Sequence, residues 1–203
     1  MNKRRGLAAV ATAVALSGCG LSLVPRGPAT AQQLAGPWQP MPLSVGPETR
    51  AEFDAACRDH PAMPKDLALV IMDARGDGRL VVGYAGPDGS DAWVSATIGA
   101  EPSTKCQIIS TTDRAAVPPP LAERDLRLSL VTGTDRGWSA ITGRAGADID
   151  QVIAEVPDSP RIVATLADGW FALWVPREAE PTFDYRLLGL DAGGAEVAEL
   201  ESP

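Results

Sequence analysis

The amino-acid sequence predicts a mainly β protein made of antiparallel strands, with one short helix near its N-terminus. Clusters of glycine, proline and aspartate recur along most of the chain. Their spacing of about eight to twelve residues is typical of short strands joined by turns. The segments between these clusters are short apolar runs, or they alternate between apolar and polar residues, as the strands of a sandwich or a meander do. Only one segment has a convincing helical period.

That helix is expected over residues 48–58. Glu48 lies in its first turn, where the helix dipole favours a negative charge. Phe53, Ala56 and Cys57 follow the i, i+3, i+4 spacing of one apolar helix face. Pro61 ends the segment, because proline cannot continue a helix.

Two runs of strands follow, and a stretch of three prolines at 118–120 separates them. Before the prolines, strands are expected at 67–72, 79–84, 92–98 and 107–111, with hairpin spacing that indicates a meander. After them, strands are expected at 126–131, 138–143, 149–156, 161–166, 170–175, 183–190 and 195–200. Leu126, Leu128 and Leu130 alternate with polar or smaller residues, which predicts one half-buried strand.

The first residues have the pattern of a signal peptide. Three basic residues at 3–5 precede an uncharged apolar stretch over 6–16, which is too short to cross a bilayer. The next motif, Leu16-Ser17-Gly18-Cys19, resembles the lipobox of bacterial lipoproteins. The resemblance implies that Cys19 carries a diacylglycerol and holds the protein to the extracytoplasmic face of the cell membrane. The alternative is an ordinary secretory peptide, and the route of export stays open.

Four segments are therefore expected: a lipoprotein signal peptide at 1–18, a lipid-anchored flexible tether at 19–47, a helix plus β-meander at 48–117, and a β-module at 121–203. The tether is expected because prolines and glycines fill this stretch without any sustained period. Trp38 and Met41 are the residues of the tether that could dock on the domain. The last two segments form either two domains or a single one.

The charge of the chain restricts its partners. Three of its 18 basic residues lie in the leader. The mature chain is therefore expected to have 15 basic and 26 acidic residues, which gives a net charge of −11. An acidic surface repels nucleic acid and anionic lipid headgroups. We therefore expect no nucleic-acid partner, and we expect membrane attachment through the N-terminal lipid. The remaining expected partner is an envelope protein or glycan of unknown identity.

Two cysteines remain once Cys19 is lipidated. Cys57 and Cys106 form an even pair in an exported chain, which predicts one disulfide. The loop that it closes spans 49 positions, for which the chain-entropy model gives about 4 kcal/mol of stabilisation. The alternative is two unpaired buried thiols.

The last third of the chain carries a second resemblance. It contains Gly143-Arg144-Ala145-Gly146, the segment IVATLADGWFALWVP at 162–176, and YRLLGLDAGG at 185–194. These stretches resemble an Ig-like β-module found at the C-terminal end of many uncharacterised secreted or membrane-anchored proteins of high-GC Gram-positive bacteria. The chain departs from that pattern at Leu173 and Val175. The resemblance implies an Ig-like fold and brings no established activity.

No group of residues predicts a catalytic, metal or cofactor site. His60 is the one histidine and no G-x-S-x-G motif accompanies it, so we expect a surface or capping role. One histidine and two paired cysteines do not supply zinc ligands. The acidic turns with Asp73 and Asp77, and with Asp88 and Asp91, do not match a calcium loop and are expected to hold solvated carboxylates.

The tryptophans are the remaining candidates. In the strand expected at 170–175, Trp170 and Trp174 share one face, while Phe171, Leu173 and Val175 share the other. A strand that is apolar on both faces is typical of a buried, central position. The alternative is an exposed aromatic platform for a sugar or a peptide.

Three functions fit these observations. The favoured hypothesis is a surface-anchored, non-enzymatic binding or structural module of the cell envelope. The second is an envelope hydrolase that uses paired carboxylates, with Asp73 or Asp91 as candidate acids. The third is an accessory or sensor subunit of a membrane complex.

Overall fold

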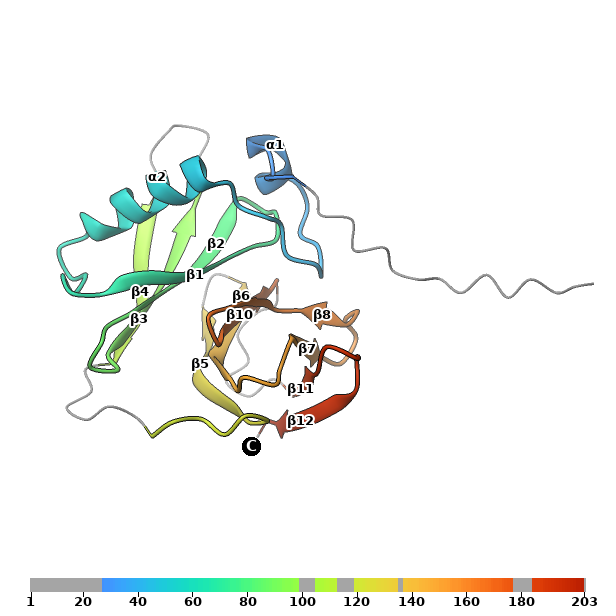
Figure 1. Cartoon of the computed structure of the whole chain (residues 1–203). Helices are drawn as coiled ribbons and strands as arrows, with labels where there is room; N and C mark the ends of the chain where they lie inside the picture. Colours follow the sequence, from blue (N-terminus) through green and yellow to red (C-terminus); the bar gives the residue numbers. More distant parts are fainter. Residues whose placement is uncertain (1–26, 99–104, 113–118, 135–136, 177–183, 203) are drawn as a thin grey trace, which may run out of the picture.

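The computed structural model describes residues 27–98, 105–112, 119–134, 137–176 and 184–202. Within them the chain is mainly β, with two helices and three antiparallel sheets of four strands each. The predicted fold class is confirmed. Figure 1 shows helix α2 over the first sheet, and the remaining strands gathered on the other side of that sheet. The expected signal peptide and the lipobox-like motif with Cys19 lie outside the described residues.

The first sheet is the predicted meander, in which each strand pairs with the next along the chain. Its strands are β1 (Ala68–Ala74), β2 (Arg79–Ala85), β3 (Asp91–Thr97) and β4 (Lys105–Thr112). Gly76, Asp77 and Gly78 form the turn between β1 and β2, and all three have positive φ angles. Glycine and aspartate adopt this left-handed backbone more readily than other residues, which explains the sequence of the turn.

Helix α2 (Pro47–Arg58) matches the predicted helix and is tied to the sheet by a disulfide. Pro47 occupies its first turn, where no amide hydrogen is needed. Phe53 and Cys57 are the buried residues of the helix. Cys57 is bonded to Cys106 of β4, with an S–S distance of 2.01 Å and Cα atoms 5.3 Å apart. The predicted disulfide therefore joins the helix to the edge strand of the first sheet.

The described part of the predicted tether, residues 27–46, lies against the domain instead of extending freely. It contains the short helix α1 (Ala31–Leu34), which Thr30 caps and whose Leu34 is buried. Further along, the amide groups of Gln39 and Leu43 donate to the carbonyl oxygens at the end of β1. The expectation of a flexible tether over 19–47 is wrong for this stretch. Apolar side chains and main-chain hydrogen bonds hold it, and neither requires a regular sequence period.

The second and third sheets form the C-terminal half. The second sheet contains, in spatial order, β5 (Leu126–Thr134), β6 (Trp138–Ala145), β10 (Trp170–Val175) and β9 (Thr165–Ala167). The third contains β12 (Glu196–Glu201), β11 (Arg186–Leu190), β7 (Gln151–Glu155) and β8 (Ile162–Val163). Buried residues of both sheets share one hydrophobic core, as in a β-sandwich.

Two details of this half differ from the sequence prediction. The single strand expected at 161–166 is divided, because β8 pairs with the third sheet and β9 with the second. A register shift between Leu128 and Leu130 breaks the expected alternation of β5. Leu128 packs into the core between the second and third sheets, whereas Leu130 packs into the core between the first and second. A bulge has this effect because one extra residue reverses the side-chain alternation.

The helical layer and the three sheets are stacked, and a hydrophobic core lies between each layer and the next. The first lies between α2, the N-terminal segment and the first sheet, the second between the first and second sheets, and the third between the second and third sheets. The middle core contains residues of both predicted halves, such as Trp93 of β3 and Trp174 of β10. The two halves are therefore in direct apolar contact.

Candidate functional site

The five tryptophans gather between the first and second sheets. Trp93, Trp138, Trp170 and Trp174 are buried there, and Trp38 of the N-terminal segment packs against them. We call these five residues the tryptophan layer. Three of the ring pairs are edge-to-face, with centroids 5.9–6.5 Å apart, an arrangement that aromatic rings favour.

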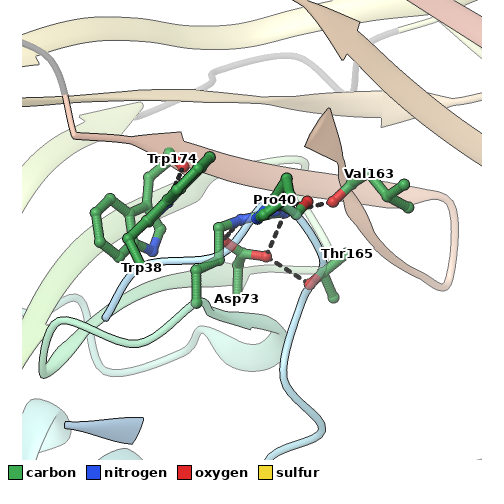
Figure 2. Close-up of polar contacts among 7 residues, drawn as sticks. Trp38, Pro40, Asp73, Val163, Thr165 and Trp174 are labelled. Atoms are coloured by element: carbon green, nitrogen blue, oxygen red, sulfur yellow. Dashed lines mark hydrogen bonds and ion pairs between the residues drawn. The ribbon is translucent and has the colours of Figure 1, made fainter. Parts of the chain in front are cut away.

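The structure confirms that the tryptophans of β10 belong to the core. Trp174 is fully buried and 8% of Trp170 is exposed. On the opposite face of the strand, Phe171, Leu173 and Val175 are buried against the third sheet. The Trp38 indole N–H donates to the Trp174 carbonyl oxygen at 3.1 Å (Figure 2). The tryptophan layer therefore joins the two halves and does not form an exposed platform.

A buried ion pair lies beside the tryptophan layer. The Arg75 guanidinium donates to both carboxylate oxygens of Asp73, at 2.8 and 3.0 Å, and both side chains are fully buried. It also donates to the carbonyl oxygens of Pro40 and Val163, and the Thr165 hydroxyl donates to Asp73 at 2.6 Å (Figure 2). One arginine thus connects β1, the N-terminal segment and the point where β8 leads into β9.

Asp73 is consequently unsuited to the hydrolase hypothesis. The expectation of a solvated turn carboxylate is wrong, because β1 continues through Asp73 and buries it against the C-terminal half. Burial raises the pKa of Asp73, and the Arg75 guanidinium opposes that rise. A carboxylate with no exposed surface and three side-chain hydrogen bonds cannot reach a substrate proton without breaking the ion pair.

The other acidic turn contains one exposed aspartate, Asp88, and one buried aspartate, Asp91. Asp88 is exposed and accepts hydrogen bonds from the Ser90 amide and hydroxyl groups, which lower the pKa of Asp88. Asp91 begins β3 and is buried, so the expectation of a solvated carboxylate is wrong for it as well. His60 follows the helix, and its side chain accepts a hydrogen bond from the Ala62 amide at 3.3 Å, which is a local turn contact.

A cleft of about 360 Å³ opens where the two halves meet, and it brings Asp91 together with residues of the second sheet. We call it the interface cleft. Its polar side chains are Asp91 of β3, Arg127 and Ser129 of β5, and Arg144 of β6, and Trp170 borders it. The turn between β2 and β3 and the segment 119–121 complete its wall.

The G-R-A-G motif places Arg144 at this cleft. A Cβ atom at either Gly143 or Gly146 would stand 2.2 Å from a carbonyl oxygen of the β5 strand or of the segment before it. Only glycine allows such an approach. Between the two glycines, the Arg144 guanidinium lies over the Trp170 ring, 4.3 Å from its centroid, and Arg144 Nε donates to the Gly169 carbonyl oxygen at 3.2 Å.

Sequence reasoning did not find this cleft. From the sequence alone, Arg127 is expected to point to solvent from an alternating strand, and Arg144 is expected to lie in a turn. Their convergence depends on strand register, since Arg127 pairs directly with Arg144 and Arg144 pairs directly with Trp170. The one signal in the sequence is the pair of arginines flanked by glycine and apolar residues, and this signal does not identify a partner strand.

Comparisons with protein-family models, with curated proteins and with solved structures found no match for this chain. Across the residues that the structure describes, no helix has the length and hydropathy of a membrane span. Those residues also contain no group of three or more His, Cys, Asp or Glu side chains placed to hold a metal ion.

Proposed function

We propose that this chain is an exported, lipid-anchored protein of the cell envelope, which acts by binding a ligand in the interface cleft and not by catalysis. The observation that carries the binding function is the cleft itself. Small-molecule sites are typically concave, have a few converging polar groups, and occur where domains meet. Here Asp91 of the first sheet faces the same cleft as Arg127 and Arg144 of the second.

Two features support the location. The Cys57–Cys106 disulfide is typical of an oxidising, extracytoplasmic compartment. The lipobox resemblance supports attachment through Cys19. In Figure 1 the turn between β2 and β3, which borders the cleft, lies at the end of the molecule away from α1. An anchor on the N-terminal side of α1 is therefore compatible with a cleft that stays accessible to ligands.

The hydrolase alternative has less support. A glycosidase needs two carboxyl groups about 5–10 Å apart that flank the scissile bond, one of them protonated. Asp73 is committed to Arg75, and Asp91 shares its cleft with two arginines. Among the residues that the structure describes, no second carboxyl side chain lines the cleft beside Asp91, and the reaction needs such a pair.

Cys19→Ala is expected to move the protein out of the membrane fraction, or to leave it unprocessed, because the thiol that receives the lipid is gone. Fractionation of cells that produce the wild type and the variant, followed by immunoblotting, measures this. A Cys19→Ala protein that stays in the membrane fraction as fully as the wild type would contradict the lipoprotein proposal.

A photoreactive residue in the cleft is expected to form adducts with envelope material. Leu121 lines the cleft, whereas Asp158 is exposed in a turn outside it. Leu121→benzoylphenylalanine should therefore give cross-linked species on irradiated cells, and Asp158→benzoylphenylalanine should not. Mass-shifted bands detected by immunoblotting provide the measurement.

Two results would contradict the proposed binding function. One is the absence of adducts from position 121 in a folded protein, or equal adducts from both positions. The other is hydrolysis of envelope glycans by the purified protein that Asp91→Asn abolishes while the melting temperature stays unchanged. The second result would establish the hydrolase alternative.

A further inference from the structure

We propose that the chain has a second binding site, a groove in which an extended peptide segment of a partner protein adds to the edge of the first sheet. The groove has a volume of about 460 Å³ and lies between residues 42–45 of the N-terminal segment and residues 163–166 at the junction of β8 and β9. Met72 of β1 also lines it. We call it the edge groove. It shares no lining residue with the interface cleft, so this inference does not rest on the proposed function.

The first argument is the direction in which the main-chain groups of Met72 point. In an antiparallel pair, residues that exchange hydrogen bonds alternate with residues that do not. The Ile98 amide donates to the Gly78 carbonyl oxygen, so the register of β2 against β3 makes every second residue from Gly78 onward, including Val82, bond to β3. Val82 is the residue opposite Met72. Met72 therefore directs its N–H and C=O groups away from β2, toward the edge of the sheet.

The N-terminal segment covers only the last positions of this edge. The amide groups of Gln39 and Leu43 donate to the carbonyl oxygens of Arg75 and Ala74. Met72 lies two positions before Ala74 and so faces the same edge. Outside the strand ladders, no main-chain hydrogen bond among the described residues engages Met72. The next position along β1 therefore offers a donor and an acceptor to a further strand.

The opposite wall of the groove provides a second residue of this kind. The Ala145 amide donates to the Gly169 carbonyl oxygen, so the same alternation makes Phe171 bond to β6. Leu166 of β9 is the residue opposite Phe171, and it consequently directs its main-chain groups away from β10. Leu166 also lines the groove. Main-chain groups at two sheet edges select an extended peptide, whose own main chain supplies the matching donors and acceptors.

The side chains of the walls restrict the peptide further. Leu43, Val45 and Leu166 are partly buried apolar residues that line the groove. Alternate side chains of an extended peptide point to the same face, so apolar residues at every second position can pack against them. Arg50 of α2 and Asp150, next to β7, also line the groove. The partner is therefore expected to supply an extended segment that is apolar at alternate positions and carries both an acidic and a basic residue.

The probe is a library of random heptapeptides displayed on phage and selected against the complete mature protein. Enriched sequences are expected to lack proline, which has no amide hydrogen to donate to a sheet edge, and to alternate as described. The strongest peptide is then synthesised in blocked form, together with two versions that carry N-methyl groups on the odd or on the even amides. At least one methylated version should bind about tenfold more weakly, because it loses hydrogen bonds to the edge.

Amide hydrogen exchange followed by NMR locates the peptide in the wild-type protein. At saturating peptide, the amide hydrogens of Met72 and Leu166 should exchange about tenfold more slowly or less, because each gains an acceptor or is shielded from solvent. The Leu121 amide, at the interface cleft, should keep its exchange rate. This readout needs no variant, so it separates the edge groove from the interface cleft in the native chain.

Ser44→Trp should weaken binding of the peptide by about tenfold or more, because Ser44 is exposed and lines the groove, where a large side chain would occupy the peptide's space. Ser159→Trp is the matched control. Ser159 is an exposed serine in a turn outside the groove, and this variant should bind the peptide like the wild type.

Slower exchange at Met72 and Leu166, together with weaker binding of a methylated peptide, supports the proposal even if Ser44→Trp fails to fold. Three results would overturn it: no enriched peptide, equal binding of both methylated versions, or exchange rates at the two amides that the peptide leaves unchanged. A wild-type dimer that Ser44→Trp dissociates would also overturn it, because the occupant of the groove would then be a second copy of the chain.

Discussion

Arg75→Met is expected to lower the free energy of unfolding by about 3–5 kcal/mol, because it leaves the Asp73 carboxylate buried without its counter-ion. Arg75 supplies two hydrogen bonds to Asp73 and one each to the carbonyl oxygens of Pro40 and Val163. These acceptors come from three separate parts of the chain. Urea unfolding followed by tryptophan fluorescence measures the loss, since the tryptophan layer lies beside the ion pair.

The double variant Asp73→Leu/Arg75→Met is the informative control. It removes both charges, and a buried ion pair replaced by apolar residues of similar volume is often tolerated. We therefore expect the double variant to be more stable than Arg75→Met alone, although the Thr165 hydroxyl also loses its acceptor. The single variant Asp73→Leu completes the comparison. If the double variant loses as much free energy of unfolding as Arg75→Met and Asp73→Leu lose together, the two charges do not interact.

Trp174→Ala is expected to cost about 3–5 kcal/mol, the usual range for removing a large buried aromatic side chain. Trp174 is fully buried and contacts Trp38 and Trp138 edge to face. For a domain of this size, such a loss lowers the melting temperature by about 10 °C. Differential scanning calorimetry measures it directly.

Trp174→Phe is the matched variant, because it keeps an aromatic ring in the same space and should lose less stability. Binding of any ligand to these variants should fall only as the folded fraction falls. A Trp174→Ala protein that melts like the wild type but no longer binds would show that this tryptophan is a ligand contact. Trp170→Ala differs, because Trp170 borders the interface cleft and supports Arg144, so binding is expected to fall even where the variant stays folded.

Much of the fold could be predicted because it depends on local patterns. The apolar face of α2, the turns of the meander and the two apolar faces of β10 all follow from residue spacing within about a dozen positions. The disulfide was predictable for a different reason. The prediction assigned Cys19 to a lipid and the chain to an oxidising compartment, which left two cysteines with one possible pairing. The structure forms that disulfide between α2 and β4.

Features that depend on contacts between distant segments could not be predicted in this way. The stretch at 27–46 has no period, yet the Trp38 indole and the amide groups of Gln39 and Leu43 attach it to other elements. The division of one expected strand into β8 and β9 likewise depends on which sheet offers free hydrogen-bonding partners. Neither property is encoded in local residue spacing.

The sequence by itself determined the fold class, the helix α2 and the two apolar faces of β10, because periodicity is a local property that needs no coordinates. The pairing of Cys57 with Cys106 was a prediction from the cysteine count, and the structure confirms it. Only the tertiary structure decided the environments of Asp73, Arg127 and Arg144. Asp73 became a buried counter-ion because β1 meets the C-terminal half at that residue. The two arginines became neighbours because the register of β5 against β6 sets them opposite one another. A charged residue acquires its role from the groups that surround it, and those groups come from segments far apart in the chain.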